Sequence, residues 1–96
     1  MANPRTIAYG TREHKNLEAV AKMLEALSPN GARYAVENVY FDLGQDWMWT
    51  TIVRYGYMEC QVLTPKEWNE VISAETVDDL ANAVNDIRNG KWFADK

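Results

Sequence analysis

The sequence predicts an α+β domain in which an antiparallel three-stranded meander packs against one N-terminal and two C-terminal helices. Three observations favour this class: a helical apolar period in the first third, a central block rich in β-branched and aromatic residues, and two capped helix starts near the C-terminus. A length of 96 residues suits one compact domain and is too short for two. Residues 1–96 are therefore expected to form a single domain, with residues 1–4 and 94–96 disordered.

A helical period runs through the first third of the chain. Apolar side chains recur at spacings of three and four residues from about Thr11 to Leu27, as on the buried face of an amphipathic helix. Pro29 disfavours helical geometry at the residue before it, so this helix is expected to end at Ser28. Positions 5–9 predict a short fourth strand. The apolar positions of the helix are Leu17, Val20, Leu24 and Leu27.

Residues 32–63 change character, because β-branched and aromatic side chains dominate and no helical stripe is present. A two-residue loop at positions 55–56 sets Val53 opposite Met58. This register gathers apolar side chains on one face, which is expected to pack against the helices, and leaves Ile52 on the opposite face. The three expected strands span residues 33–43, 47–54 and 57–63.

The first two strands are expected to pair through a three-residue loop, which places Phe41 beside Trp49 and makes the sheet a meander. Tyr34 and Val36 are out of phase with the odd-numbered apolar residues that follow them. Two explanations stay open: a β-bulge near positions 37–38, or a strand that is half-buried on both sides.

Two helix starts near the C-terminus carry capping signals. Residues 64–67 place a threonine at the N-cap, a proline at the first helical position and a glutamate where it completes a capping box. This helix is expected to end near positions 73–74. Thr76 then caps a last helix, which is expected to continue to Gly90.

The charge balance and the apolar runs exclude several classes of protein. Ten Lys and Arg against fourteen Asp and Glu give a formal charge of -4, which disfavours direct binding to nucleic acid or to an anionic membrane. The longest uncharged stretch, residues 47–53, is far shorter than the roughly 20 residues that cross a bilayer. Cys60 is the lone cysteine and the first residues contain no apolar signal segment, so a cytoplasmic location is expected.

Catalytic and metal chemistry lack the residues that they need. One histidine and one cysteine cannot supply a structural zinc site. Asp42 and Asp46 offer oxygen ligands, but their spacing matches no calcium loop and acids are ordinary in turns. His14 is expected on an exposed helical turn, and Cys60 is expected in the core, where its thiol stays protonated. We therefore expect neither an enzyme activity nor a bound cofactor or metal.

Acidic residues concentrate in the last two predicted helices. Residues 1–35 carry five basic and three acidic groups, whereas positions 67–86 carry six acids and no Lys or Arg. Helix capping explains three of these acids but leaves Glu70, Glu75 and Asp86, which are flanked by asparagines. These three residues are either a solvated helix face or a binding surface for a basic partner. They form the first candidate partner-binding site.

Aromatic residues are in excess of what one small core buries. The chain contains four Trp and five Tyr; the tryptophans at positions 47, 49 and 68 are expected to share the core, and Tyr40 has no inward place. Arg54, Tyr55 and Tyr57 are expected to form an exposed hairpin tip, and these residue types are frequent in contact hot spots. Base stacking there is disfavoured, because residues 32–63 carry two arginines against four acids. This tip is the second candidate partner-binding site.

The leading hypothesis is a small, acidic, non-enzymatic protein that docks on another macromolecule. Its size and charge resemble those of phage or mobile-element inhibitors that occupy a host protein or a nucleic-acid-binding protein, an argument from type that no motif supports. A first alternative is a homo-oligomer that pairs through the sheet face opposite the helices. A second alternative is a ligand-binding or enzymatic domain with a helix–sheet pocket. The self-pairing face would contain Met48, Ile52, Tyr57 and Leu63.

Overall fold

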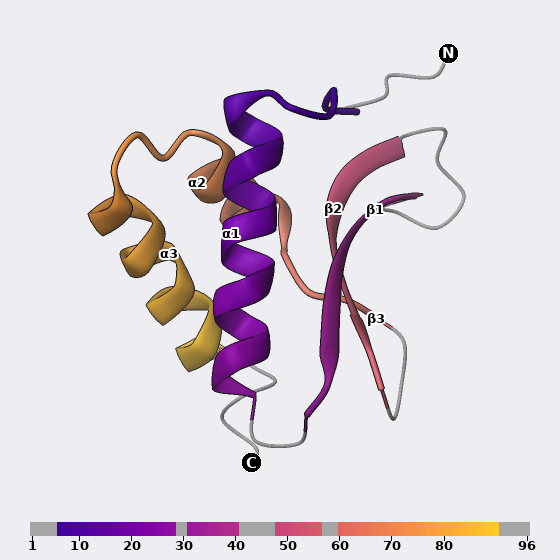
Figure 1. Cartoon of the computed structure of the whole chain (residues 1–96), viewed down its shortest axis with the longest axis vertical. Helices are drawn as coiled ribbons and strands as arrows, with labels where there is room; N and C mark the ends of the chain where they lie inside the picture. Colours follow the sequence, from indigo (N-terminus) through magenta and orange to yellow (C-terminus); the bar gives the residue numbers. More distant parts are fainter. Residues whose placement is uncertain (1–5, 29–30, 41–47, 57–59, 91–96) are drawn as a thin grey trace.

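The computed structural model describes residues 6–28, 31–40, 48–56 and 60–90. Three helices pack on an antiparallel hairpin (Figure 1), which confirms the α+β class and the order of the helices. The expected disordered ends, positions 1–4 and 94–96, lie outside the described residues. In chain order the elements are α1 (Arg12–Leu27), β1 (Arg33–Tyr40), β2 (Met48–Tyr55), β3 (Cys60–Gln61), α2 (Pro65–Ile72) and α3 (Val77–Gly90).

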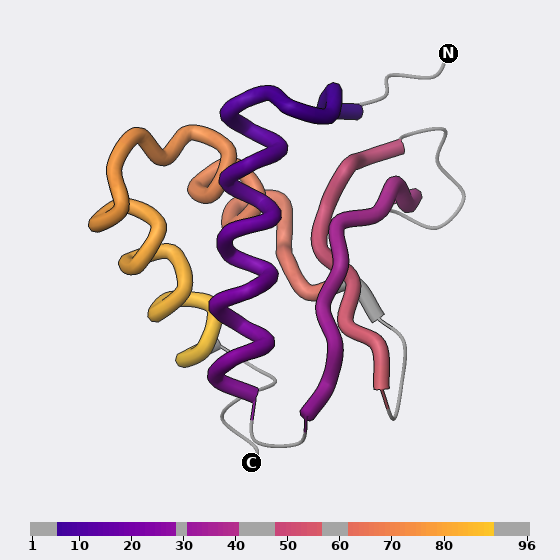
Figure 2. Tube along the Cα trace, in the orientation of Figure 1, coloured from indigo at the N-terminus to yellow at the C-terminus, as the bar shows by residue number. Residues whose placement is uncertain are grey.

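The sheet consists almost entirely of the hairpin of β1 and β2, so the expected meander of three comparable strands is wrong. β3 contributes two residues, and Val53 lies opposite Gln61, not opposite Met58. The chain leaves the sheet early because Val62 and Leu63 turn into the core, where both are buried. Figure 2 shows the chain passing from the hairpin directly to α2.

β1 and β2 pair along their full lengths without interruption. Val39 lies opposite Trp49, so the expected pairing of Phe41 with Trp49 is wrong by two residues, a shift that keeps each side chain on its expected face. The continuous ladder excludes the bulge near positions 37–38. The other explanation is confirmed, because Ala35 and Val36 point to opposite faces and are both half-buried.

The two faces of β2 are both covered, which corrects the expected sidedness of the sheet. Ile52 is fully buried in one cluster with Leu17 and Leu24 of α1, although we expected it on the face away from the helices. Trp49, on the other face, is also buried and meets Trp68 of α2. Ile52 and Leu63 are core residues, so these two members of the expected self-pairing face are not available to a second copy. Tyr57 of that face lies outside the described residues.

The segment before α1 forms no strand within the described residues 6–11, so the expected fourth strand is not present there. Its described residues attach to the sheet by a side-chain bond instead: the Ile7 amide donates to Thr50 Oγ1 at 2.8 Å. Gly10 then adopts a φ of 91°, a left-handed conformation that favours glycine, and turns the chain into the helix.

The helix starts follow the capping signals of the sequence. Thr11 caps α1 by accepting from the His14 amide at 3.2 Å. In α2 the Glu67 amide donates to Thr64 Oγ1, and the Glu67 carboxylate accepts from the Thr64 amide, so the predicted capping box is confirmed. The Asp79 amide donates to Thr76 Oγ1 at 3.0 Å, as expected for the start of α3.

Asn16 connects the three helices. Its buried side-chain amide donates to the carbonyls of Val71 and Ala74, each at 3.0 Å, at the end of α2 and in the turn before α3. The Val71 carbonyl lies in the last turn of α2 and also accepts from the Ala74 amide at 3.2 Å, whereas Ala74 follows the helix. Asn16 therefore supplies, from α1, the cap that the end of α2 needs.

We expect Asn16→Ala to lower the free energy of unfolding by about 2 kcal/mol, because the buried Ala74 carbonyl would lose its donor and the Val71 carbonyl would keep only the Ala74 amide. Asn16→Asp should cost more at pH 7, since a carboxylate would face two carbonyl oxygens. Urea denaturation measures both variants, and Asn85→Ala on the exposed face of α3 is the matched control, with little expected change. A loss for Asn16→Ala no larger than that of the control would contradict this role.

Candidate functional site

Helix packing brings together two of the three acids of the first candidate site. Glu70 is on α2 and Asp86 is on α3, and the buried residues beside them, Val71 and Ile87, belong to the core. The pKa of Glu70 is raised, first because burial disfavours the charged form and then because the carboxyl of Asp86 is hydrogen-bonded to it and repels its charge. Lys66, one turn earlier on α2, opposes this shift. The two carboxyl groups thus share a single site.

A depression of about 310 Å³ between α2 and α3 is lined by Glu70 of this pair, but not by Asp86. Asp79 lines it together with Glu70, whereas Glu75 does not. The Asp79 carboxylate accepts from the Glu75 amide at 3.0 Å, and this bond, with help from Thr76, lowers the pKa of Asp79. Asp79 lies at the capped start of a helix, and capping alone accounts for an acid at this position. Asp79 was therefore not expected in the site. The depression also contains Ser73, Ala74 and Asn82.

Glu75 is exposed in the turn between α2 and α3. Its backbone is tied to Asp79, but no bond of its carboxylate to another described residue is present. The acidic surface therefore consists of the pair Glu70 and Asp86, the neighbouring Asp79, and Glu75 at the end of the turn. We call this set the acidic surface below.

The second candidate site is described only in part. Arg54 and Tyr55 are half-exposed at the end of β2, and Tyr57 lies outside the described residues. The Tyr55 hydroxyl donates to Glu37 Oε2 at 3.0 Å, so this ring is held against β1. Tyr40 is 57% exposed but sits at the other end of the hairpin, opposite Met48. Among the described residues, the surplus aromatics do not form one patch.

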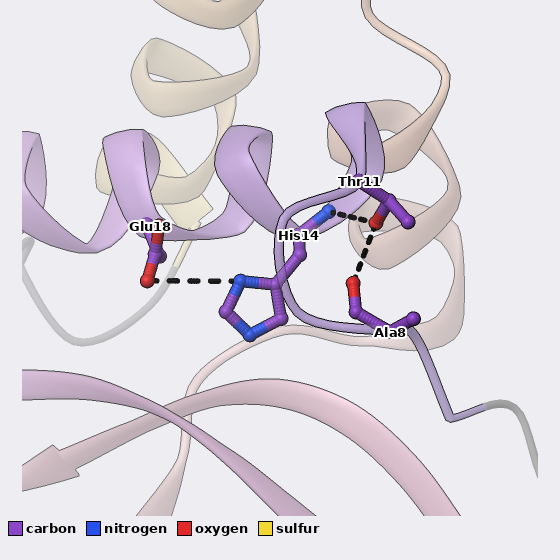
Figure 3. A network of polar contacts seen from close by, with 4 residues as sticks. All are labelled: Ala8, Thr11, His14 and Glu18. Atoms are coloured by element: carbon purple, nitrogen blue, oxygen red, sulfur yellow. Dashed lines mark hydrogen bonds and ion pairs between the residues drawn. The ribbon is translucent and has the colours of Figure 1, made fainter.

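His14 lies in a groove that sequence reasoning did not find. Its side chain is only 12% exposed, so the expectation of a solvated histidine is wrong. Figure 3 shows His14 Nδ1 facing Glu18 Oε2, at 3.6 Å, and the ring of Tyr9 meets the imidazole edge-on at 5.1 Å. The i,i+4 spacing of His14 and Glu18 was visible in the sequence, but the burial of His14 depends on β1.

The groove runs between α1 and β1 and has a volume of about 500 Å³. No Ser, Thr or Cys lines it within the described part of the chain, and the nearby Thr11 hydroxyl already donates to the Ala8 carbonyl at 2.8 Å. A histidine–carboxylate pair is present, but the nucleophile that it would activate is not among these lining residues. Side chains of both elements form the groove, among them Tyr9, His14, Glu18, Lys22, Tyr34 and Val36.

Metal and membrane sites find no support in the described residues. In residues 6–28, 31–40, 48–56 and 60–90, no three His, Cys, Asp or Glu side chains converge as metal ligands. Asp42 and Asp46, the weak oxygen-ligand candidates, lie outside these ranges, and the side chain of Cys60 is likewise not described. The helices in these ranges are too short or too polar to cross a bilayer.

Comparison with known proteins gives no family: the chain matches no protein-family model, no curated protein and no solved structure. The function must therefore be argued from the surfaces themselves.

The carboxyl pair makes a prediction about titration. We expect Asp86→Asn to lower the pKa of Glu70 towards its ordinary value, because the repulsion from the Asp86 charge is removed. Carboxyl-detected NMR titration measures this pKa directly. Asp78→Asn removes an exposed carboxylate that does not act on Glu70 and serves as the control. An equal pKa in all three proteins would show that Glu70 and Asp86 do not interact.

The same shift predicts how stability depends on pH. The raised pKa means that the folded protein binds a proton at Glu70 more readily than the unfolded chain does. The contribution of Glu70 to stability is therefore complete below its unfolded pKa, and it is lost as the pH rises through its folded pKa. Glu70→Gln should therefore be slightly more stable than the wild type at pH 7, by at most about 0.2–0.5 kcal/mol, the cost of a like-charge pair that solvent screens. Urea denaturation at pH 4 and pH 7 checks this, and a loss of stability at pH 7 would contradict it.

Proposed function

We propose that this protein is a non-enzymatic binding protein that docks on another macromolecule through the acidic surface of α2 and α3. The observation that carries the proposal is the pairing of Glu70 and Asp86, two carboxyl groups from different helices, of which Glu70 is half-buried and Asp86 is exposed. Like charges held together cost free energy, and a solvated helix face has no need of that arrangement. A cationic group from a partner would relieve the repulsion.

The charges around the pair favour a basic partner. Glu75 and Asp79 extend the acidic surface along the turn between the helices, and both are exposed. Lys66 is the cation that acts on Glu70 from the same helix, one turn away. A protein with clustered Arg or Lys side chains fits this surface, whereas phosphate-rich nucleic acid would be repelled by it and by the formal charge of -4.

The depression beside the pair gives the docking some specificity. Ser73 and Asn82 line it, so a guanidinium or ammonium group that reaches the carboxylates also meets neutral hydrogen-bonding side chains. Arginine suits such a site best, because its planar fork donates to two acceptors at once. A cytoplasmic inhibitor that covers the basic surface of a nucleic-acid-binding protein would use this chemistry, and we place the protein in that class.

We expect charge reversal of the pair to abolish partner capture. The wild type and the double variant Glu70→Lys/Asp86→Lys are each immobilised and exposed to a bacterial lysate, and bound proteins are quantified by mass spectrometry. The expected result is at least a tenfold loss of a specific basic protein, a change of about 1.4 kcal/mol in binding. The Kd of that protein, purified, is then measured at two salt concentrations, because charged contacts weaken as salt rises.

The double variant Glu13→Lys/Asp42→Lys is the matched control for net charge. It replaces acids outside α2 and α3, and both double variants change the formal charge from -4 to 0. Retained capture by this control, with loss in the Glu70/Asp86 variant, supports docking at the acidic surface. Unchanged capture by the Glu70/Asp86 variant, or equal loss in both, rejects it.

A further inference from the structure

β1 has a free edge. The strand order is β1-β2-β3, so β1 has only one neighbour within the described sheet. The amide of Tyr34 donates to Glu25 Oε1 at 3.1 Å, so it points away from β2. Because successive residues of an antiparallel strand alternate in direction, the amides and carbonyls of Val36 and Asn38 point the same way. Within the described part of the chain these outward groups have no hydrogen-bonding partner.

The direction of these groups agrees with the rest of the sheet. The Ile52 carbonyl accepts from the Val62 amide at 3.0 Å, on the side of β2 that faces β3. Ile52 lies opposite Val36, so the pair does not bond across the hairpin and each residue bonds outward. The edge of β1 thus offers donors and acceptors at two-residue intervals, which is the spacing of another strand.

The groove that contains His14 lies along this edge. α1 provides one wall, with His14, Glu18 and Lys22 one turn apart, and Tyr34 and Val36 of β1 provide the other. The wall of α1 carries both a carboxylate and an ammonium group, and His14 Nδ1 is buried without a hydrogen-bond partner among the described residues. A volume of about 500 Å³ is available between the two elements.

We propose that the edge of β1 binds an extended peptide segment of a partner protein by strand addition, with the peptide lying in the groove between β1 and α1. Main-chain pairing with Val36 and Asn38 holds the peptide. One apolar side chain of the peptide packs against Tyr34 and Val36, and a basic side chain next to it on the same face reaches Glu18 and His14. A compact small molecule would not use donors and acceptors repeated along a strand.

This site is separate from the acidic surface, because it is formed by α1 and β1 and not by α2 and α3. The proposal therefore does not rest on the function proposed above. The protein would carry a peptide-binding groove on one side of α1 and an acidic docking surface on the helices at the other side (Figure 1).

The probe is a phage-displayed library of random linear 12-residue peptides, selected on the full chain, and the most enriched peptide is synthesised. At saturating peptide, hydrogen–deuterium exchange followed by NMR should show the amides of Val36 and Asn38 slowed at least about tenfold. The Tyr34 amide, already bonded to Glu25, is the internal control and should change little. The enriched peptide is expected to carry the apolar and basic pair of side chains.

Two variants at one position separate main-chain pairing from side-chain packing. Val36→Pro removes the outward amide, and a proline is tolerated at an edge position whose N–H does not pair. Val36→Ala keeps that amide and shortens the same side chain. We expect the Kd of the peptide to rise at least about tenfold in Val36→Pro relative to Val36→Ala. If Val36→Pro does not fold, the exchange measurement on the wild type decides.

Several results overturn the proposal. These are a library without any enriched peptide, a bound peptide that leaves the Val36 and Asn38 amides unprotected, and a peptide whose binding is lost in Glu70→Lys/Asp86→Lys. Sedimentation tests whether a second copy of this chain occupies the edge instead. A concentration-dependent dimer, with the Val36 and Asn38 amides protected in the absence of peptide, would assign the edge to that copy and reject the peptide.

Discussion

The indole of Trp68 joins the helical layer to the hairpin. Trp68 is 2% exposed, its Nε1 donates to the Thr50 carbonyl at 2.7 Å, and its ring meets Trp49 at 4.5 Å with the planes at 80°. One side chain of α2 therefore contacts backbone and ring of the central strand β2. Once α2 is placed, Asn16 ties α1 to its end and α3 packs beside it. The acidic surface and the groove beside His14 both depend on this placement, because each is formed between two elements.

The energetics explain why the fold tolerates the repulsion between Glu70 and Asp86. A like-charge pair near water costs a few tenths of a kcal/mol, whereas full burial of one large aliphatic side chain contributes roughly 1.5–3 kcal/mol. The same two helices bury Val71, Val84 and Ile87 on their inner faces. Packing therefore determines how α2 and α3 lie, and the carboxyl groups follow. The cost is small enough to persist in a stable protein and large enough for a cation to relieve.

The parts of the fold that follow from local chemistry were predictable, and the parts that depend on distant contacts were not. Capping by Thr64 and Thr76 involves residues three apart, so the helix starts were correct. The register of β3 depends on where the chain leaves the sheet, and the burial of Val62 that marks this point cannot be read from the turn residues. Glu70 and Asp86 were named singly, but their contact requires α2 and α3 to pack. The groove at His14 escaped prediction because its second wall is β1, beyond a turn.

The hydrogen bond that the Tyr34 amide donates to Glu25 also limits aggregation through the edge of β1. A bare strand edge is a template on which identical chains stack without limit. Here a carboxylate from α1 occupies the first outward donor of β1, which leaves a short accessible run beginning at Val36. Glu25 thus shortens the part of the β1 edge that another strand could use.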